Sequence, residues 1–237
     1  MKLHLLRVST VRAFSGPVPA YLIRLGDGTN ILVDTGAAIE SGPSLIPPAA
    51  GFDLTESEHI VAQLAGLDLT PGEIDLVVNT HLHPDHAGNN DAFPDAEFVV
   101  QRAEHEAALA EAQPTFAWAR RHWDAPSLKY RTVEGDTTLA PGVDLIDTRG
   151  HSPGHQSVLV RLPHTGPVLI AGDALPFSTA TDADTRLIGP FDFSEPAVRL
   201  STRRLAEVAA REHVAFTVFS HDSAQWSTLR TGAHYYD

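Results

Sequence analysis

Residues 80–89 constrain this chain more than any other segment, because they place four potential metal ligands directly after a buried strand. The apolar run at 76–78 predicts a short strand that is buried on both faces. It leads into Thr-His-Leu-His-Pro-Asp-His-Ala-Gly-Asn. Imidazole nitrogens and carboxylate oxygens are ligands that zinc and similar ions prefer. The segment therefore predicts a metal centre at the end of a strand.

The spacing of these ligands indicates more than one ion. Side chains alternate along an extended backbone, so His81 and His83 are expected to point the same way and to share one ion. Pro84 is expected to bend the chain, which would turn Asp85 and His86 towards a second ion. Four ligands cannot fill two sites, so further ligands must come from other segments.

Three later segments carry such candidates, each at the end of a predicted strand. The turn Gly-His-Ser-Pro-Gly-His at 150–155 supplies His151, His155 or both, and Asp173 and His221 follow apolar runs. The carboxyl ends of strands are where the binding sites of α/β proteins usually lie. The other seven histidines have no partner at ligand spacing.

The pattern of apolar residues predicts a mixed α/β chain. Thr55 and Glu58 form a capping-box pattern that predicts a helix beginning near Thr55. Strands are expected at 3–8, 20–25, 30–33, 75–79, 97–101, 130–134, 143–148, 157–162, 168–171 and 214–219, and further helices at 103–112, 114–123 and 195–211. Two sheets packed back to back with helices outside, or one mixed sheet in three layers, would both fit this order. No linker or repeat divides the sequence, so residues 1–237 are expected to form one domain.

Composition excludes several classes of protein. The formal net charge is −13, from 17 basic and 30 acidic residues, which argues against a nucleic-acid partner and favours a small-molecule substrate. The absence of cysteine excludes disulfides, thiolate ligands and a cysteine nucleophile. No apolar run approaches the ~18 residues of a membrane span, and the N-terminus lacks a secretory signal, so we expect no membrane partner and a cytoplasmic location. The oligomeric state is left open by the sequence.

Taken together, these motifs resemble the metallo-β-lactamase superfamily. The chain contains H-x-H-x-D-H at 81–86, G-H-x-x-G-H at 150–155, G-D at 172–173 and S-H at 220–221, after an early D-T-G at 34–36. The resemblance spans about residues 18–222 and implies a four-layer αββα sandwich with the metals at one edge. It implies that the first metal is held by His81, His83 and His155, the second by Asp85, His86 and His221, and that Asp173 bridges them. Asp34 is then expected to orient a ligand, and His151 to form hydrogen bonds within its loop.

Such a centre predicts hydrolysis without a covalent intermediate. The cofactors would be two divalent ions, with zinc favoured and iron, manganese or cobalt as alternatives. Metal binding lowers the pKa of water from ~15.7 to about 7, which gives a metal-bound hydroxide that attacks a carbonyl carbon. Asp85 is the best candidate for the catalytic residue that carries a proton to the leaving group.

Within the superfamily, the chain is most similar to the N-acyl homoserine lactonases. Residues 17–23, 31–36, 100–104 and 150–157 carry this similarity, and it predicts the opening of a lactone such as an N-acyl homoserine lactone. Those lactonases place a tyrosine three residues after the bridging aspartate, where this chain has Pro176. Tyr21 and Tyr130 are candidates for its role.

Three alternatives stay open at this stage. A glyoxalase-II-like thioesterase uses the same ligands but needs basic residues to hold glutathione. An iron-dependent persulfide dioxygenase resembles the signature but holds one iron with two histidines and one aspartate. A non-catalytic metal-binding protein would need a closed set of four ligands. Residues 112–130 lie outside the shared motif and are expected to set specificity, with Trp118 and Trp123 either in the core or in a pocket wall.

Overall fold

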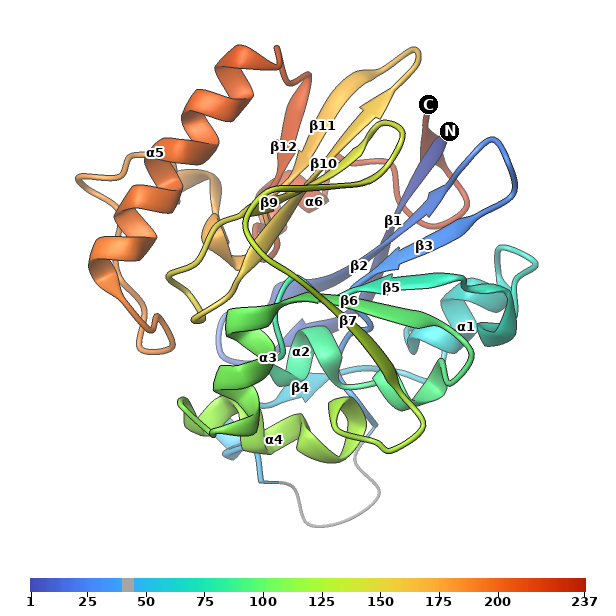
Figure 1. Ribbon diagram of the computed structural model, residues 1–237, viewed down its shortest axis with the longest axis horizontal. Helices are drawn as coiled ribbons and strands as arrows, with labels where there is room; N and C mark the ends of the chain where they lie inside the picture. The colour runs from blue at the N-terminus through green and yellow to red at the C-terminus, as the bar shows by residue number, and fades with distance from the viewer. Residues whose placement is uncertain (40–44) are drawn as a thin grey trace.

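The computed structural model describes residues 1–39 and 45–237, and two β-sheets packed face to face form its centre (Figure 1). The first sheet has eight strands in the order β13-β1-β2-β3-β5-β6-β7, with β4 paired to β1. Its strands are β1 (Lys2–Val11), β2 (Gly16–Arg24), β3 (Asn30–Val33), β4 (Phe52–Asp53), β5 (Leu76–Val78), β6 (Glu97–Gln101), β7 (Lys129–Val133) and β13 (Tyr235–Tyr236). The second sheet has five strands in the order β12-β11-β10-β9-β8. They are β8 (Thr137–Ala140), β9 (Val143–Asp147), β10 (Gln156–Leu162), β11 (Gly166–Ile170) and β12 (Phe216–Val218).

Helices cover the outer faces of both sheets. The first sheet is flanked by α1 (Ile60–Ala65), α2 (Pro84–Ala87), α3 (Arg102–Leu109) and α4 (Pro114–Trp123), and the long helix α5 (Glu195–Arg211) covers the second (Figure 1). A short helix α6 (Ser223–Trp226) follows β12. This order of layers is the predicted αββα sandwich, and it excludes a single mixed sheet in three layers.

Alternating side chains explain why both faces of each sheet are buried. On β2, Tyr21 and Ile23 point into the core between the sheets, whereas Leu22 packs with residues of α1. On β10, Val158 and Val160 join the same inter-sheet core, whereas Leu159 packs towards α5. Each strand thus contributes to two apolar layers, because successive side chains leave a strand on opposite faces.

Strand direction brings the motif segments to one edge. Strands β3, β5, β6 and β7 run parallel, and so do β11 and β12 of the other sheet. The segments after β3, β5 and β6 therefore leave the first sheet at the same edge. The segments after β11 and β12 leave the second sheet together and carry Asp173 and His221.

One predicted helix begins later than expected. The Glu58 carboxylate accepts hydrogen bonds from the backbone N–H of Thr55 (2.8 Å) and from its hydroxyl (3.0 Å), but these residues form a turn. Helix α1 begins at Ile60, with His59 as its N-cap. The His59 ring also contacts the side-chain oxygen of Asn89 at 2.9 Å. This tertiary contact holds His59 outside the helix, so the capping-box pattern identified the turn and misplaced the helix start.

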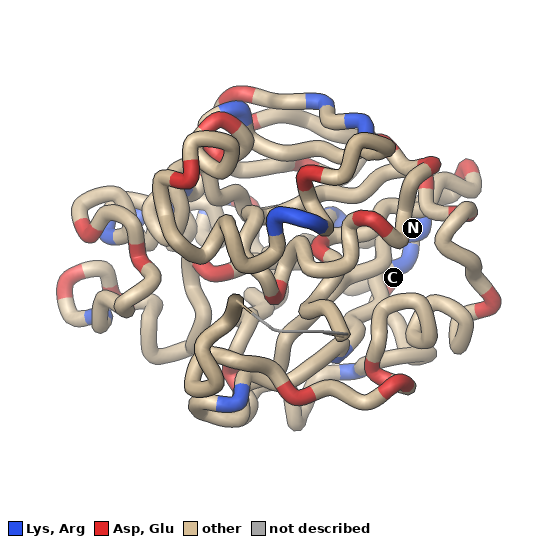
Figure 2. Tube along the Cα trace, turned by 90° about the horizontal axis from the view of Figure 1, so that it is seen from below, with Lys and Arg blue, Asp and Glu red and all other residues tan. Residues whose placement is uncertain are grey.

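Charge is spread over the surface of the molecule. Figure 2 shows Lys and Arg dispersed among the more numerous Asp and Glu. Within the described residues, no helix combines the length and the hydrophobicity that crossing a membrane requires.

A buried glutamine links the two sheets beneath their common edge. Gln156 of β10 is fully buried; its amide donates to the carbonyl of Asn79 (2.8 Å), and its side-chain oxygen accepts from Gln101 of β6 (3.0 Å). We predict that Gln156→Leu lowers the free energy of unfolding by about 1–3 kcal/mol, because both partners stay buried without this bond. Urea unfolding measures the change. The control Gln63→Leu removes a solvent-exposed bond to Ser57 and should stay within about 0.5 kcal/mol. Equal effects of the two changes would contradict the prediction.

Candidate metal centre

The first histidine segment folds as its alternation predicted, and the next residues form a helix. His81 and His83 lie on the same side, with ring centroids 4.5 Å apart. Pro84 occupies the first turn of α2, where its fixed φ suits a helix and its missing N–H costs nothing. Asp85 and His86 therefore project from one turn of helix, where the sequence had suggested only a bend.

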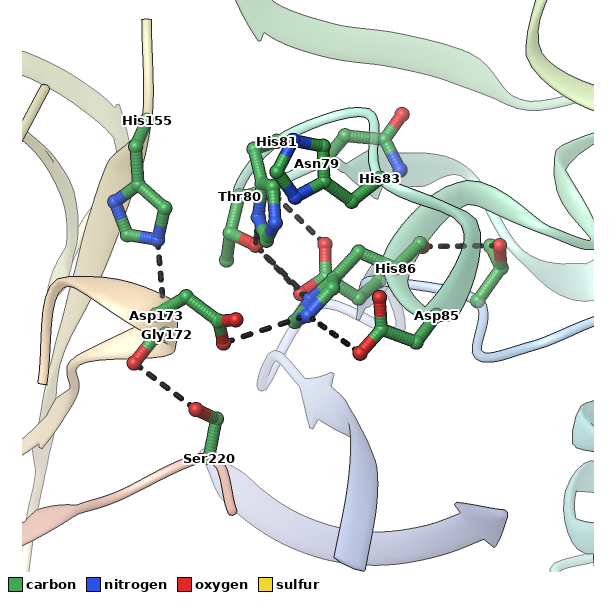
Figure 3. A network of polar contacts seen from close by, with 12 residues as sticks. Asn79, Thr80, His81, His83, Asp85, His86, His155, Gly172, Asp173 and Ser220 are labelled. Atoms are coloured by element: carbon green, nitrogen blue, oxygen red, sulfur yellow. Dashed lines mark hydrogen bonds and ion pairs between the residues drawn. The ribbon is translucent and has the colours of Figure 1, made fainter. Parts of the chain in front are cut away.

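Side chains from four segments converge at this edge of the sandwich. Three sets of residues have ligand atoms within 4.8 Å of one another: His81, His83 and His151; His81, His86 and Asp173; and Asp85, His86 and His221. Six of the seven predicted metal ligands are among them. Figure 3 shows His81, His83, Asp85, His86 and Asp173 facing a common centre.

Asp173 lies between histidines that come from three different segments. Its Oδ2 atom is 3.4 Å from Nε2 of His151 and 3.2 Å from Nε2 of His221. Its Oδ1 atom is 3.4 Å from Nε2 of His86. One carboxylate thus reaches histidines of different sets, and its role as a bridging ligand stays a prediction.

The structure places His151, and not the predicted ligand His155, beside the other candidate ligands. His155 is fully buried; its Nδ1 contacts the Thr148 hydroxyl at 2.8 Å, and its Nε2 accepts the backbone N–H of Asp173 at 2.9 Å. Both ring nitrogens are therefore engaged with the protein, and His155 belongs to none of the three sets (Figure 3). His151 instead places Nε2 at 3.1 Å from Nδ1 of His83, while its Nδ1 lies 3.0 Å from Asp192.

Sequence spacing could not have shown which of His151 and His155 is the ligand, because both histidines flank the same turn. Asp192, which holds the ring of His151, was also missed by the sequence reasoning. It lies in an irregular segment 41 residues away, and no local pattern marks it.

Asp34 orients His86 from beneath the site. Its Oδ2 atom lies 2.8 Å from Nδ1 of His86, and its Oδ1 accepts the backbone N–H of Thr80 at 2.7 Å. The residue adopts a φ of 59°, an uncommon backbone conformation for a residue other than glycine. Burial raises the pKa of Asp34, while His86 and Thr80 oppose that rise. A carboxylate that holds the far nitrogen of a ligand histidine is a common support of metal sites.

The donor set fits a pair of divalent cations. The Nε2 atoms of His81, His83 and His86 and the Oδ1 atom of Asp173 are buried without a hydrogen-bond partner, and such atoms are normally satisfied. Burial and the neighbouring histidines lower the pKa of His81 well below its usual value and that of His83 to about 3. Both rings are thus neutral at neutral pH, as metal coordination requires.

Three aspartates surround His86 and give this part of the site excess negative charge. Burial opposes a charged His86, but Asp85, Asp173 and Asp34 outweigh burial and hold its pKa well above the usual value. Burial likewise opposes ionisation of Asp173, yet His221 and His86 outweigh burial and hold its pKa well below its usual range. Carboxylates gathered this closely need positive charge beside them, which a divalent cation would supply.

A cavity of about 590 Å³ opens onto these residues. His83, Asp85, His151, Asp173 and His221 form part of its wall. Most of the remaining wall is apolar and includes two edge-to-face aromatic pairs, Phe14 with Phe177 and Trp118 with Phe191. Trp118 therefore lines the cavity, whereas Trp123 is fully buried in the core.

No tyrosine lines this cavity among the described residues. Tyr21 is buried between the sheets beside Trp226, and the hydroxyl of Tyr130 donates to the carbonyl of Trp123 at 2.7 Å. Both candidates for the lactonase tyrosine are thus held elsewhere. Pro176 itself lines the cavity, and its carbonyl accepts the backbone N–H of His221 at 2.9 Å.

The four-layer fold and the His/Asp centre define a class of metal-dependent hydrolases. The profile of the Metallo-beta-lactamase superfamily matches residues 14–221. The chain belongs to this superfamily, and it is a metal-dependent hydrolase.

Among characterised proteins, the chain is similar to N-acyl homoserine lactonases in both sequence and structure. The chain is 34% identical over 227 residues to the N-acyl homoserine lactonase AiiA of Bacillus thuringiensis subsp. kurstaki, which covers 92% of this chain and 86% of that protein. It is 35% identical over 239 residues to the N-acyl homoserine lactonase AttM of Rhizobium johnstonii, covering 93% and 87%. A solved N-acyl homoserine lactone hydrolase, with N-hexanoyl-L-homoserine bound at its catalytic metal centre, superposes with a TM-score of 0.87 at 30% identity and covers 99% of this chain and 98% of that one.

Metal removal is expected to destabilise the protein. Zinc at 1,000 times its dissociation constant should add about 4 kcal/mol of stability, or about 8–16 °C in Tm. Protons compete with metal for His86 and His221, whose pKa values are raised mainly by the neighbouring aspartates against the effect of burial. The gain in Tm at a fixed zinc concentration should therefore be larger at about pH 8 than at about pH 6. Scanning calorimetry of chelator-treated and zinc-loaded protein measures both effects. A zinc-independent Tm would contradict the assignment of a metal centre.

Proposed function

We propose that this protein hydrolyses the lactone ring of N-acyl homoserine lactones, and that residues 1–237 form one catalytic domain. The apolar cavity beside the His/Asp centre is the observation that carries the proposal. If the lactone ring lies at the His/Asp centre, the acyl chain of the substrate can pack against the apolar wall of the cavity. The lactonases of similar sequence support the same substrate class.

The charge of the cavity wall favours a neutral substrate over a glutathione thioester. Arg186 is the one basic residue other than histidine among the described lining residues. It is 4% exposed, and its guanidinium donates to the hydroxyl of Thr202 at 2.7 Å and to the carbonyl of Ala174 at 2.5 Å. One of its nitrogens thus holds the fold, whereas its Nε atom is buried without a hydrogen-bond partner. Apart from Arg186, the described wall contains no lysine or arginine that could hold a glutathione carboxylate.

We assign the metal ligands from the sets that the fold brings together. His81, His83 and His151 would hold the first ion and Asp85, His86 and His221 the second, with Asp173 between them. Zinc suits a donor set of imidazole and carboxylate without thiolate. Seven candidate ligands converge here, which is more than the two histidines and one aspartate of a single iron site, and this number favours a binuclear centre.

Each group then has a task in ring opening. Two bound ions would supply Lewis acidity and a water molecule of lowered pKa. Asp34 and Asp192 fix the rings of His86 and His151, and the aromatic wall excludes water from the acyl side. The partly exposed Asp85 carboxylate lies in the cavity wall, 3.5 Å from Nε2 of His86. When water adds to the carbonyl carbon and the ring C–O bond breaks, Asp85 is placed to pass the proton to the leaving ring oxygen.

Proton release on paired substrates tests the proposal. We expect zinc-loaded protein to open N-hexanoyl homoserine lactone with kcat/KM in the range of about 10⁴–10⁸ M⁻¹s⁻¹ typical of enzymes, and to act poorly on a glutathione thioester. A His83→Ala variant controls for contaminating hydrolases, because it removes a proposed ligand. Faster turnover of the thioester than of the lactone would refute the lactonase proposal and leave the metallohydrolase intact.

A matched pair of variants tests the ligand assignment. His151→Ala should lose one equivalent of zinc and lower kcat/KM by more than about 100-fold, because a ligand matters more than the partners around it. His155→Ala should retain both ions and lower stability by about 1–3 kcal/mol, because it removes two buried hydrogen bonds. Metal content by atomic emission and thermal unfolding separate the two effects. Loss of zinc from His155→Ala with full retention in His151→Ala would reverse the assignment.

A further inference from the structure

A buried carboxylate outside the ligand set joins the two segments that supply the first set of ligands. Glu104 is fully buried on α3, immediately after β6. It has no role in the ligand sets, and it does not line the cavity. It belongs to the segment 100–104, whose similarity to the lactonases the proposed mechanism does not use. A buried carboxylate is costly unless several donors satisfy it.

Three donors from two distant segments meet this carboxylate. Oε1 accepts the backbone N–H of Leu82 at 3.0 Å. Oε2 accepts the hydroxyl of Ser152 at 2.6 Å and the backbone N–H of Gly154 at 2.8 Å. Leu82 stands between His81 and His83, and Ser152 follows His151. Glu104 thus contacts both segments of the first set, one through each of its oxygens.

Close packing makes this connection rigid. Any side chain at position 154 would collide with the backbone nitrogen of Glu104, so the turn that follows His151 lies directly on the start of α3. The glycine of the G-H-x-x-G-H motif is therefore required by contact with α3. The Glu104 side chain and the close approach of Gly154 to the Glu104 backbone together set the distance between the two ligand segments.

We propose that Glu104 is a positioning residue for the metal centre: by bonding Leu82 on one side and the Ser152–Gly154 turn on the other, it fixes His81 and His83 relative to His151 and so sets the affinity of the first metal position. This inference rests on the ligand assignment made above. It does not depend on which carbonyl compound is hydrolysed.

The substitution Glu104→Gln isolates the hydrogen bonds from the packing. Glutamine has the same shape, but one of its two terminal atoms is an NH₂ donor. That group must face either the N–H of Leu82 or the two donors of the turn, because the carboxylate accepts on both sides. One of the two segments is therefore released while the volume of the side chain is preserved.

Zinc affinity is the readout that a merely structural role would not change. We expect Glu104→Gln to bind its first zinc about 10–100-fold more weakly in competition with a chromophoric chelator, as is typical when a partner of metal ligands is lost. The visible spectrum of the cobalt-loaded variant should also differ from that of the unsubstituted protein, because it reports ligand geometry. Glu106→Gln, on the exposed side of the same helix, is the matched control and should leave both unchanged.

The outcomes separate this inference from its alternatives. A Glu104→Gln protein with unchanged zinc affinity and cobalt spectrum would overturn the inference, even if its metal-free Tm falls. If that variant does not fold, Ser152→Ala removes one donor and keeps the carboxylate, and a smaller loss of zinc affinity is expected; no loss would overturn the inference. Because these readouts need no substrate, weaker zinc binding alongside an inactive unsubstituted protein would support the role of Glu104 and refute the lactonase proposal.

Discussion

The contact of Asp173 with histidines from both halves of the site is the interaction on which the centre depends. Its two oxygens reach Nε2 of His86 on one side and Nε2 of His151 and His221 on the other. This is possible because β11 ends at the same edge as β5, although the two strands belong to different sheets. Gly172 has φ +55 there, and a Cβ atom at that position would lie 2.7 Å from Nε2 of His155. The tight turn thus brings the carboxylate to the centre.

Around that contact, three of the candidate ligand histidines are held by a second polar group through Nδ1. Asp34 holds His86, and Asp192 holds His151, in both cases through Nδ1. The Nδ1 of His221 lies 2.8 Å from the carbonyl of Pro17. These supports leave the Nε2 atoms directed at the centre. Imidazoles fixed in this way lose little side-chain entropy when they bind a metal, so the fold itself prepares the site.

The same edge of the sandwich combines a charged centre with an apolar wall. Ligands come from the segments after the strands, whereas the wall comes from α4 and from the irregular segments before β2 and α5. Among the described residues this wall contains aromatic rings, no lysine and a single arginine, so it offers mainly apolar contacts. The candidate ligands and most of the apolar wall therefore come from different parts of the chain.

The sequence by itself determined the fold class and most of the candidate ligands. Alternating apolar residues fix which side of each strand is buried, and H-x-H-x-D-H brings four candidate ligands together by local geometry alone. Strand β6 and helices α4 and α5 begin and end where they were predicted, because their signals are local. Other features depended on residues far away in the chain. The contact of His59 with Asn89 helps to set the start of α1. Both ring nitrogens of His155 contact distant groups, the Thr148 hydroxyl and the N–H of Asp173. Packing places Trp118 in the cavity wall and Trp123 in the core. The choice between His151 and His155 belongs to the tertiary structure, because two histidines in one turn are equivalent in spacing and differ only in the partners that folding brings to their rings.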